Sequence, residues 1–143
     1  MNIYQTAPAD YPELIELWEA SVRATHHFLK EEDIGLYRQR ILEEYFDAVK
    51  LYCTKDNGVI AGFLGIGDGM IQMLFIHPEA RGKGVGKRLL EYAMNEHGVK
   101  KVEVNEQNEQ ALGFYQYMGF TVTARAETDG LGKPYPILLM ELQ

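Results

Sequence analysis

Hydrophobic and polar positions recur along the chain with two different periods, and the period changes near residue 50. Before that point, apolar side chains stand at helical spacing, which predicts amphipathic helices over about residues 10–23 and 34–49. A short strand is predicted ahead of them at residues 3–5, and residues 24–29 fit neither helix cleanly. The first third of the chain is therefore predicted to be mainly helical.

Beyond residue 50 the pattern becomes strand-like, with turn residues between the apolar runs. Strands are predicted at residues 51–54, 59–66, 70–76, 99–104, 121–128 and 137–142, and helices over about 84–97 and 107–118. Residues 70–76 are almost continuously apolar, which is typical of a central strand that is buried on both faces. From residue 70 to 104, a strand, a glycine-rich turn, a helix and a strand predict a right-handed parallel crossover. A ligand is expected beyond the carboxyl ends of its strands.

The order of elements predicts a mixed α/β fold, and the length of 143 residues with 46% hydrophobic residues suits one domain, assigned to residues 1–143. Trp18 and the pair Met70 and Met73 follow the apolar faces and are predicted to belong to the core.

Net charge and cysteine content exclude several classes of protein. A formal net charge of -7 disfavours extended binding to a nucleic-acid backbone, so a small-molecule partner fits better. The apolar runs are far shorter than the ~20 residues that span a bilayer, and the N-terminus does not resemble a secretory signal. Cys53 is the single cysteine and has no recognisable base partner, which argues against a nucleophilic role. A cytoplasmic protein without a membrane segment or a metal is predicted.

Gly82, Gly84 and Gly86 stand between the predicted central strand and the following helix. Glycines there let a ligand approach backbone N–H groups, and the N-terminus of a helix favours an anion. Positive charge is concentrated around the same turn at Arg81, Lys83, Lys87 and Arg88. A phosphate-bearing ligand is the resulting prediction, and a tight turn with incidental surface lysines is the alternative.

Neither common nucleotide motif fits this turn. The dinucleotide signature G-x-G-x-x-G requires a third glycine where Lys87 stands. The phosphate-binding P-loop requires serine or threonine where Arg88 stands.

The pattern that remains, Arg-x-x-Gly-x-Gly from Arg81 to Gly86, resembles the acetyl-CoA loop of the GNAT superfamily of N-acetyltransferases. Residues 105–120 are similar to that family's second signature, Asn-x-x-Ala-x-x-Phe-Tyr followed by Gly-Phe. Residues 25–29 and 131–136 also resemble elements of small single-domain bacterial members of the YjaB type. The resemblance implies a single-domain GNAT-like fold, with a mixed central sheet, a parallel splayed strand pair and about four flanking helices.

The resemblance also implies how the donor, acetyl-CoA, is bound. Backbone amides around the glycine turn would bind the pyrophosphate, main-chain groups at Leu74 and Ile76 would pair with the pantetheine arm, and Asn108 would offer it a side-chain amide. The residues expected to bind the cofactor are Leu74, Phe75, Ile76, Arg81, Gly82, Lys83, Gly84, Val85, Gly86, Lys87, Arg88, Asn108 and Tyr115.

By the same resemblance, a primary amine would attack the thioester directly in a ternary complex, and a backbone N–H near Phe75 or Ile76 would stabilise the oxyanion. Tyr115 matches the tyrosine that protonates the departing thiolate. The general base is left open: His26 is the first candidate because its ordinary pKa suits proton removal. The other candidates are His27, Glu103 and a water chain.

Tyr135 is a candidate for the wall of the acceptor pocket. The sequence does not identify the acceptor amine, and a homodimer through the edge of the final strands is a further prediction. The predicted function is an acetyl-CoA-dependent N-acetyltransferase. The alternatives are a non-catalytic acyl-CoA-binding sensor or interaction module, and a phosphate or nucleotide binder.

Overall fold

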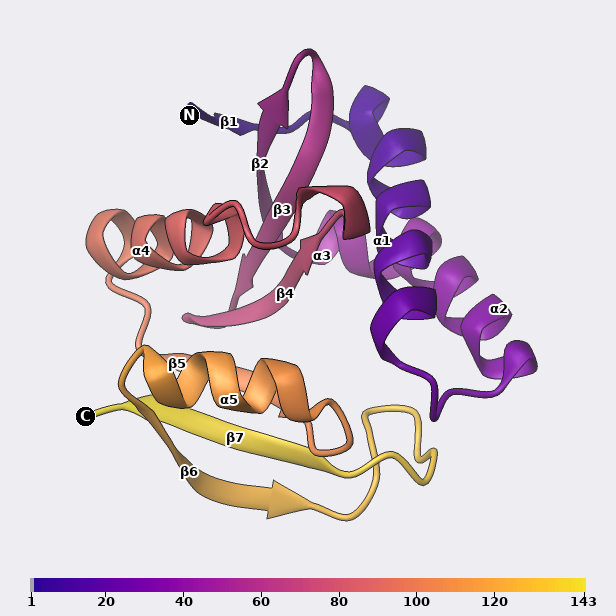
Figure 1. The fold of residues 1–143 in the computed structure, drawn as a ribbon. Helices are drawn as coiled ribbons and strands as arrows, with labels where there is room; N and C mark the ends of the chain where they lie inside the picture. The colour runs from indigo at the N-terminus through magenta and orange to yellow at the C-terminus, as the bar shows by residue number, and fades with distance from the viewer. Residues whose placement is uncertain (1) are drawn as a thin grey trace.

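The computed structural model describes residues 2–143, which form a mixed seven-stranded sheet with helices packed on both of its faces (Figure 1). The strands are β1 (Ile3–Gln5), β2 (Lys50–Asp56), β3 (Val59–Gly67), β4 (Met70–Ile76), β5 (Lys101–Asn105), β6 (Phe120–Ala126) and β7 (Ile137–Leu142). They lie in the order β1-β2-β3-β4-β5-β7-β6. The helices are α1 (Tyr11–Thr25), α2 (Glu31–Arg40), α3 (Phe46–Ala48), α4 (Val85–His97) and α5 (Glu109–Tyr117). The predicted α/β order is confirmed.

Two hydrophobic cores lie on opposite faces of the sheet. Consecutive residues of β3 point to opposite faces, so Phe63 packs in the core under α1 while Leu64 packs in the core under α4. Leu89, Leu90 and Ala93 on α4 are fully buried there. The two cores fix α1 and α4 against the sheet from either side, next to the end of β4.

The predicted helix over residues 34–49 is a continuous helical run that changes its hydrogen-bonding pattern. Its middle, Ile41–Tyr45, is a π-helical turn between α2 and α3, in which the N–H of Phe46 donates to the carbonyl of Ile41. The wider turn places two residues five positions apart on the same side. As a result, both Ile41 and Phe46 are buried.

The parallel pair of strands at the centre of the sheet separates along its length. β4 pairs with β3 over most of its residues, whereas its parallel pairing with β5 is limited to Ile71 opposite Val102. This confirms the predicted splayed strand pair. In Figure 1, α4 lies beside β4, and α5 lies in front of β5 and covers most of it.

The separation corrects the prediction that β4 is buried on both faces. Ile71 and Met73 are buried, but Leu74, Phe75 and Ile76 are only partly buried because they face the gap between the strands. Met70 is also partly exposed, so its assignment to the core is wrong, whereas Trp18 and Met73 are buried as predicted.

At the C-terminal side of the sheet, β6 is an edge strand and begins and ends slightly before the predicted range of 121–128. Its residues after Phe120 are exposed, so a homodimer through this edge stays a prediction. Among residues 2–143, no helix is long and apolar enough to cross a membrane.

Candidate active site

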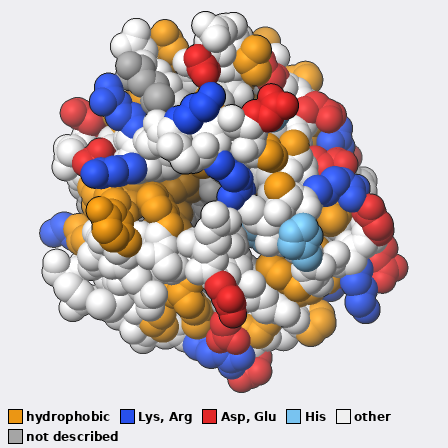
Figure 2. All heavy atoms as spheres, in the orientation of Figure 1, with side chains coloured by type: hydrophobic (Ala, Val, Ile, Leu, Met, Phe, Trp, Pro, Cys, Tyr) orange, Lys and Arg blue, Asp and Glu red, His pale blue; other side chains and the backbone are white. Residues whose placement is uncertain are grey.

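A cavity of about 490 Å³ opens where β4 and β5 separate. Its walls come from β4, the glycine turn, β5, α5 and the C-terminal end of α1. Figure 2 shows this face hollowed between α4 and α5, with hydrophobic side chains in the hollow and Lys and Arg side chains above it. The cavity therefore joins segments that are far apart in the sequence.

The glycine turn forms one side of the cavity. Gly82 and Gly84 have φ angles of 78° and 80°, in the left-handed region that favours glycine. A Cβ atom at either position would meet nothing within 4 Å, so the backbone faces open space. Gly84 is also the N-cap of α4, and as a glycine it offers no side chain to cap that end. The first amides of α4 are thus available to an anion in the cavity.

Arg81 directs its guanidinium across the cavity. Its Nη1 donates to Oε1 of Gln110 on α5 at 3.0 Å, and its Nη2 donates to Oγ of Ser21 on α1 at 3.5 Å. Its Nε atom is buried and has no hydrogen-bond partner within the described residues. Arg81 therefore connects two helices on opposite sides of the cavity, with one N–H left over.

Most of the residues predicted to bind acetyl-CoA are brought together here. Those that line the cavity are Leu74, Phe75, Ile76, Arg81, Gly82, Gly84, Val85, Gly86, Lys87, Asn108 and Tyr115. Lys83 and Arg88 are not among its lining residues, and Nζ of Lys83 lies 4.0 Å from a carboxylate oxygen of Asp56. The structure therefore places the backbone of the turn, more than its lysines, at the cavity.

Tyr115 lies on α5 with its ring packed edge-on against Phe114 and Phe120. It is buried in the protein yet lines the cavity. Burial raises the pKa of its phenol above the ordinary value, so the hydroxyl is protonated at neutral pH. A protonated phenol next to a cavity can donate a proton to a leaving group.

His26 is the residue that ends α1, and it is one of the residues that line the cavity. Its Nδ1 lies 2.7 Å from Oγ1 of Thr25, and its Nε2 lies 3.5 Å from Nδ2 of Asn108. Burial, followed by the positive charge of Arg81 and then His27, lowers the pKa of His26 to about 4. The imidazole is therefore neutral at pH 7 and can accept a proton.

The other candidates for the base are placed differently. Glu103, on β5, lines the cavity with an exposed side chain. His27 is exposed and is not one of the residues that line the cavity. Of the three side chains considered from the sequence, His26 alone combines partial burial with a place in the cavity wall.

Tyr135 is not one of the residues that line this cavity, so its place in the wall of the acceptor pocket stays a prediction. It is buried behind Phe28, with the two ring centroids 6.0 Å apart, and its hydroxyl donates to Oδ2 of Asp33. The N–H of Lys30 donates to the same hydroxyl at 3.3 Å. These long-range hydrogen bonds attach the ring to the start of α2.

Asp33, Lys133 and Tyr135 form a cluster that the sequence did not reveal, called here the Asp33 cluster. Asp33 is a buried carboxylate, and Nζ of Lys133 lies 3.2 Å from its Oδ1. The Tyr135 hydrogen bond and the Lys133 charge hold the pKa of Asp33 below its usual range. The cluster fixes the loop before β7 to the first turn of α2, and no local sequence pattern marks a contact between residues so far apart.

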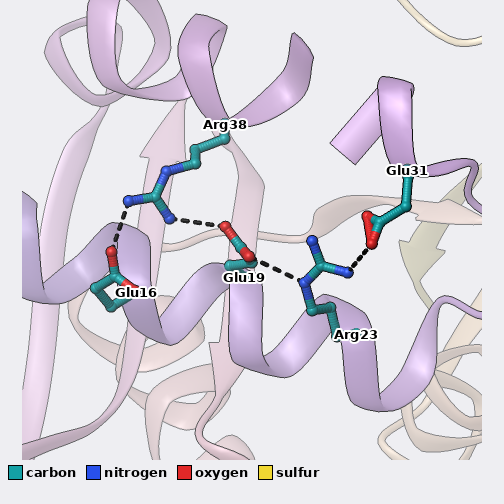
Figure 3. Close-up of polar contacts among 5 residues, drawn as sticks. All are labelled: Glu16, Glu19, Arg23, Glu31 and Arg38. Carbon is teal, nitrogen blue, oxygen red and sulfur yellow. Dashed lines mark hydrogen bonds and ion pairs between the residues drawn. The ribbon is translucent and has the colours of Figure 1, made fainter. Parts of the chain in front are cut away.

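An ion-pair network joins α1 to α2, the helices that precede and follow His26 in the sequence (Figure 3). Arg38 on α2 contacts Glu16 at 2.6 Å and Glu19 at 2.8 Å. Arg23 contacts Glu19 at 2.9 Å on its own helix and Glu31 at 2.5 Å across the turn. Charged contacts therefore hold α1 and α2 together along their facing sides.

The cavity thus contains two titratable groups whose pKa values are moved apart. Burial favours the neutral form of each, which keeps His26 a proton acceptor and Tyr115 a proton donor. This pairing suits a reaction in which one group gains a proton and the other loses one. Among residues 2–143, no group of His, Cys, Asp and Glu side chains is arranged to hold a metal ion.

Comparison with known proteins relates this arrangement to a family. Residues 16–133 match the family described as the acetyltransferase (GNAT) domain. The chain is 41% identical to peptidyl-lysine N-acetyltransferase YjaB of Escherichia coli, over 96% of this chain and 94% of that protein. It is 39% identical to the protein of the same name in Salmonella typhimurium, over 96% and 95%. The solution structure of apo-form YjaB from Escherichia coli superimposes with a TM-score of 0.87 at 37% identity, over 98% of this chain and 95% of the other.

Proposed function

The chain belongs to the GNAT acetyltransferase family and is an acetyl-CoA-dependent N-acetyltransferase, and we propose that its acceptor is the ε-amine of a lysine in a protein. The observation that carries the proposal is the similarity, over nearly the full length of both chains, to two relatives named for acetylating peptidyl lysine. The cytoplasm is the proposed location, on the grounds given by the sequence.

We propose that the donor is held mainly by backbone groups. The amides at the start of α4, together with Gly82 and Gly84, bind the pyrophosphate, because a helix N-terminus and an open left-handed turn both favour an anion. Main-chain groups of Leu74 and Ile76 pair with the pantetheine arm in the gap beside β4. The thioester then lies between the ends of β4 and β5.

The proposed reaction is a direct transfer. The amine nitrogen attacks the thioester carbonyl, a C–N bond forms, the C–S bond breaks, and free CoA leaves. A backbone N–H near Phe75 or Ile76 stabilises the oxyanion of the tetrahedral intermediate. Tyr115 gives its proton to the departing thiolate, and His26 accepts the proton that the amine nitrogen loses.

The pKa of His26 decides when that proton moves. An imidazole with a pKa of about 4 cannot readily deprotonate a lysine ammonium of pKa ~10.4, since this transfer costs about 9 kcal/mol. We therefore propose that the acceptor enters as the free amine, and that His26 takes the proton only after the C–N bond has formed. It follows that kcat/KM should rise with pH toward the pKa of the acceptor amine.

The test uses purified protein, acetyl-CoA and a peptide that carries one internal lysine and a blocked N-terminus. Release of CoA thiol, with the acetylated lysine identified by mass spectrometry, is the expected result. Controls are the same peptide with lysine replaced by arginine, a lysine-free peptide with a free α-amine, and a free polyamine. Acetylation of the α-amine or the polyamine alone would contradict the proposed acceptor and leave the family assignment intact.

Two variants test the proposed roles of the side chains. Tyr115→Phe and His26→Gln are each expected to lower kcat on the order of 10²–10⁴-fold, the usual contribution of a positioned acid or base. The KM for acetyl-CoA should change little in His26→Gln, because the proposed contacts of the pyrophosphate and the pantetheine arm are made by backbone groups and not by the imidazole. Undiminished turnover in either variant would remove that residue from the mechanism.

A further inference from the structure

We propose that Thr25 and Asn108 are positioning residues that hold the neutral ring of His26 with its proton on Nδ1 and its lone pair on Nε2. The proposal rests on the proposed function, in which His26 accepts a proton from the amine. It assigns the accepting atom and the two side chains that select it.

The hydrogen bonds of the Thr25 hydroxyl determine whether Nδ1 of His26 carries a proton. The hydroxyl of Thr25 donates to the carbonyl oxygen of Ser21, one helical turn earlier, at 2.8 Å. A hydroxyl has a single hydrogen, so toward Nδ1 of His26, 2.7 Å away, the same oxygen can only accept. Nδ1 must therefore carry the proton.

The side chain of Asn108 independently determines the protonation state of Nε2. Asn108 is the N-cap of α5, and its Oδ1 accepts from the N–H of Ala111 at 3.2 Å. This cap determines which way the amide is turned, and it leaves the NH₂ group facing Nε2 of His26 at 3.5 Å. An NH₂ group can only donate, so Nε2 must offer a lone pair.

The two assignments come from different parts of the chain and agree on one tautomer. The doubly protonated ring would place an N–H opposite the NH₂ of Asn108, so the same arrangement opposes the imidazolium. The charged and titratable groups that act on His26 are Arg81, from the turn before α4, and His27, from its own turn. Arg81 adds to the same preference for the neutral ring.

The geometry also shows how an acceptor can reach Nε2. The contact to Thr25 is short and the contact to Asn108 is at the outer limit of a hydrogen bond. An amine N–H that enters the cavity can replace the Asn108 contact while Nδ1 remains bound to Thr25. Asn108, predicted from the sequence to bind the pantetheine arm, is thereby assigned to the orientation of His26.

The experiment is ¹⁵N NMR of the histidine ring nitrogens in the protein without ligand, with the His26 signals assigned by their loss in His26→Gln. We expect a protonated Nδ1 and an unprotonated Nε2 in the wild type at pH 7. Thr25→Val should increase the fraction of His26 protonated on Nε2 and lower kcat about tenfold or more, a small part of what a general base contributes. Thr25→Ser, which retains the hydroxyl, should restore both.

Asn108→Asp and Thr54→Val complete the design. Aspartate keeps an oxygen for the cap of α5 but replaces the donor by an acceptor, so Nε2 should become protonated and the pKa of His26 should rise. Thr54, a buried threonine on β2 whose hydroxyl donates to the carbonyl of Asn2, provides the matched control, and its change to valine should leave the His26 signals in place.

A protonated Nε2 in the wild type would overturn the proposal, and so would a Thr25→Val protein with an unchanged tautomer. These outcomes differ from failure of the proposed function, because the ring signals need no turnover. If no lysine peptide were acetylated while Nδ1 carried the proton, the proposed acceptor would fail and the tautomer assignment would be supported.

Discussion

The two sides of the cavity are built in different ways. The donor side is centred on one continuous stretch, the glycine turn of residues 81–86 and the start of α4, where the proposed contacts are made by backbone groups. The side around His26 is formed by the end of α1 and the start of α5, and it depends on side chains. Contacts outside the cavity, from α2 and the loop before β7, support it. A site made of local backbone can be recognised from a short motif, whereas a site made of long-range contacts cannot.

Because the His26 side depends on a titratable side chain, acid is expected to destabilise it before the donor side. The pKa of His26 is about 4 in the folded protein and ~6.5 when unfolded, so the folded state favours the neutral ring. Its contribution to stability is fully present above pH 6.5 and is lost as the pH falls toward 4, a loss of about 3 kcal/mol.

Urea unfolding of the wild type and of His26→Gln between pH 7 and pH 4 would measure this loss. The difference in unfolding free energy between the two proteins should change by about 3 kcal/mol over that range, with the wild type losing more. Two parallel curves would show that His26 is not held neutral by the fold.

On the donor side, Gly84→Ala is expected to weaken binding of acetyl-CoA by about tenfold and to lower the stability by about 1 kcal/mol, because alanine is strained at a positive φ. Gly69 is the matched control: it has a φ of 72°, also faces open space, and lies in the turn between β3 and β4. Gly69→Ala should show the loss of stability without the loss of affinity in isothermal titration. Equal affinity losses in both variants would argue against a donor site at the turn.

A substitution in the Asp33 cluster tests the side of the cavity around His26. Asp33→Asn removes the charge that pairs with Lys133, so the loop before β7 should loosen against α2. We expect kcat/KM for a lysine peptide to fall by about fivefold, well below the 10²-fold that a 1 Å misplacement can cost. The dissociation constant of acetyl-CoA should not change.

Asp56→Asn is the control for that variant, since Asp56 is an exposed partner of Lys83 on the donor side. It should alter neither constant. A change in acetyl-CoA affinity in Asp33→Asn would mean that the two sides of the cavity are not separate.

The smallest effect is expected for the ion-pair network in Figure 3. Arg23→Gln breaks the contact between α1 and Glu31, and exposed pairs of this kind should lower the melting temperature by about 1–4 °C. The decrease should vanish in high salt, which screens exposed charges. Arg40→Gln, which breaks a pair with Glu44 further along the same helical run, is the control expected to leave the turnover unchanged.

The features that could be predicted from the sequence lie mainly on the donor side, and those that could not lie mainly around His26. Gly84, Val85 and Tyr115, which line the cavity, could be selected from the sequence because each lies in a short motif whose spacing is fixed by a turn or a helix. The contact between Tyr135 and Asp33 was missed, because the two residues lie about a hundred positions apart and no periodicity encodes it. The direction of the Arg81 side chain also depends on two helices that the motif does not include.

β4 shows a second limit of prediction from the sequence, which concerns burial. Its apolar run correctly predicted a strand, yet full burial was wrong because an apolar strand can face a cavity as well as a core. The sequence pattern shows that Leu74 and Ile76 are apolar. Whether these side chains face a core or a cavity depends on the separation of β4 from β5.

The separation of donor and acceptor sides is tested most directly by amide chemical-shift mapping with CoA first and a lysine peptide second. CoA should shift the amides of residues 81–88, and the peptide should then shift residues 25–29 and those at the end of β4 while CoA remains bound. Displacement of CoA by the peptide, or an unchanged glycine turn on addition of CoA, would contradict the account.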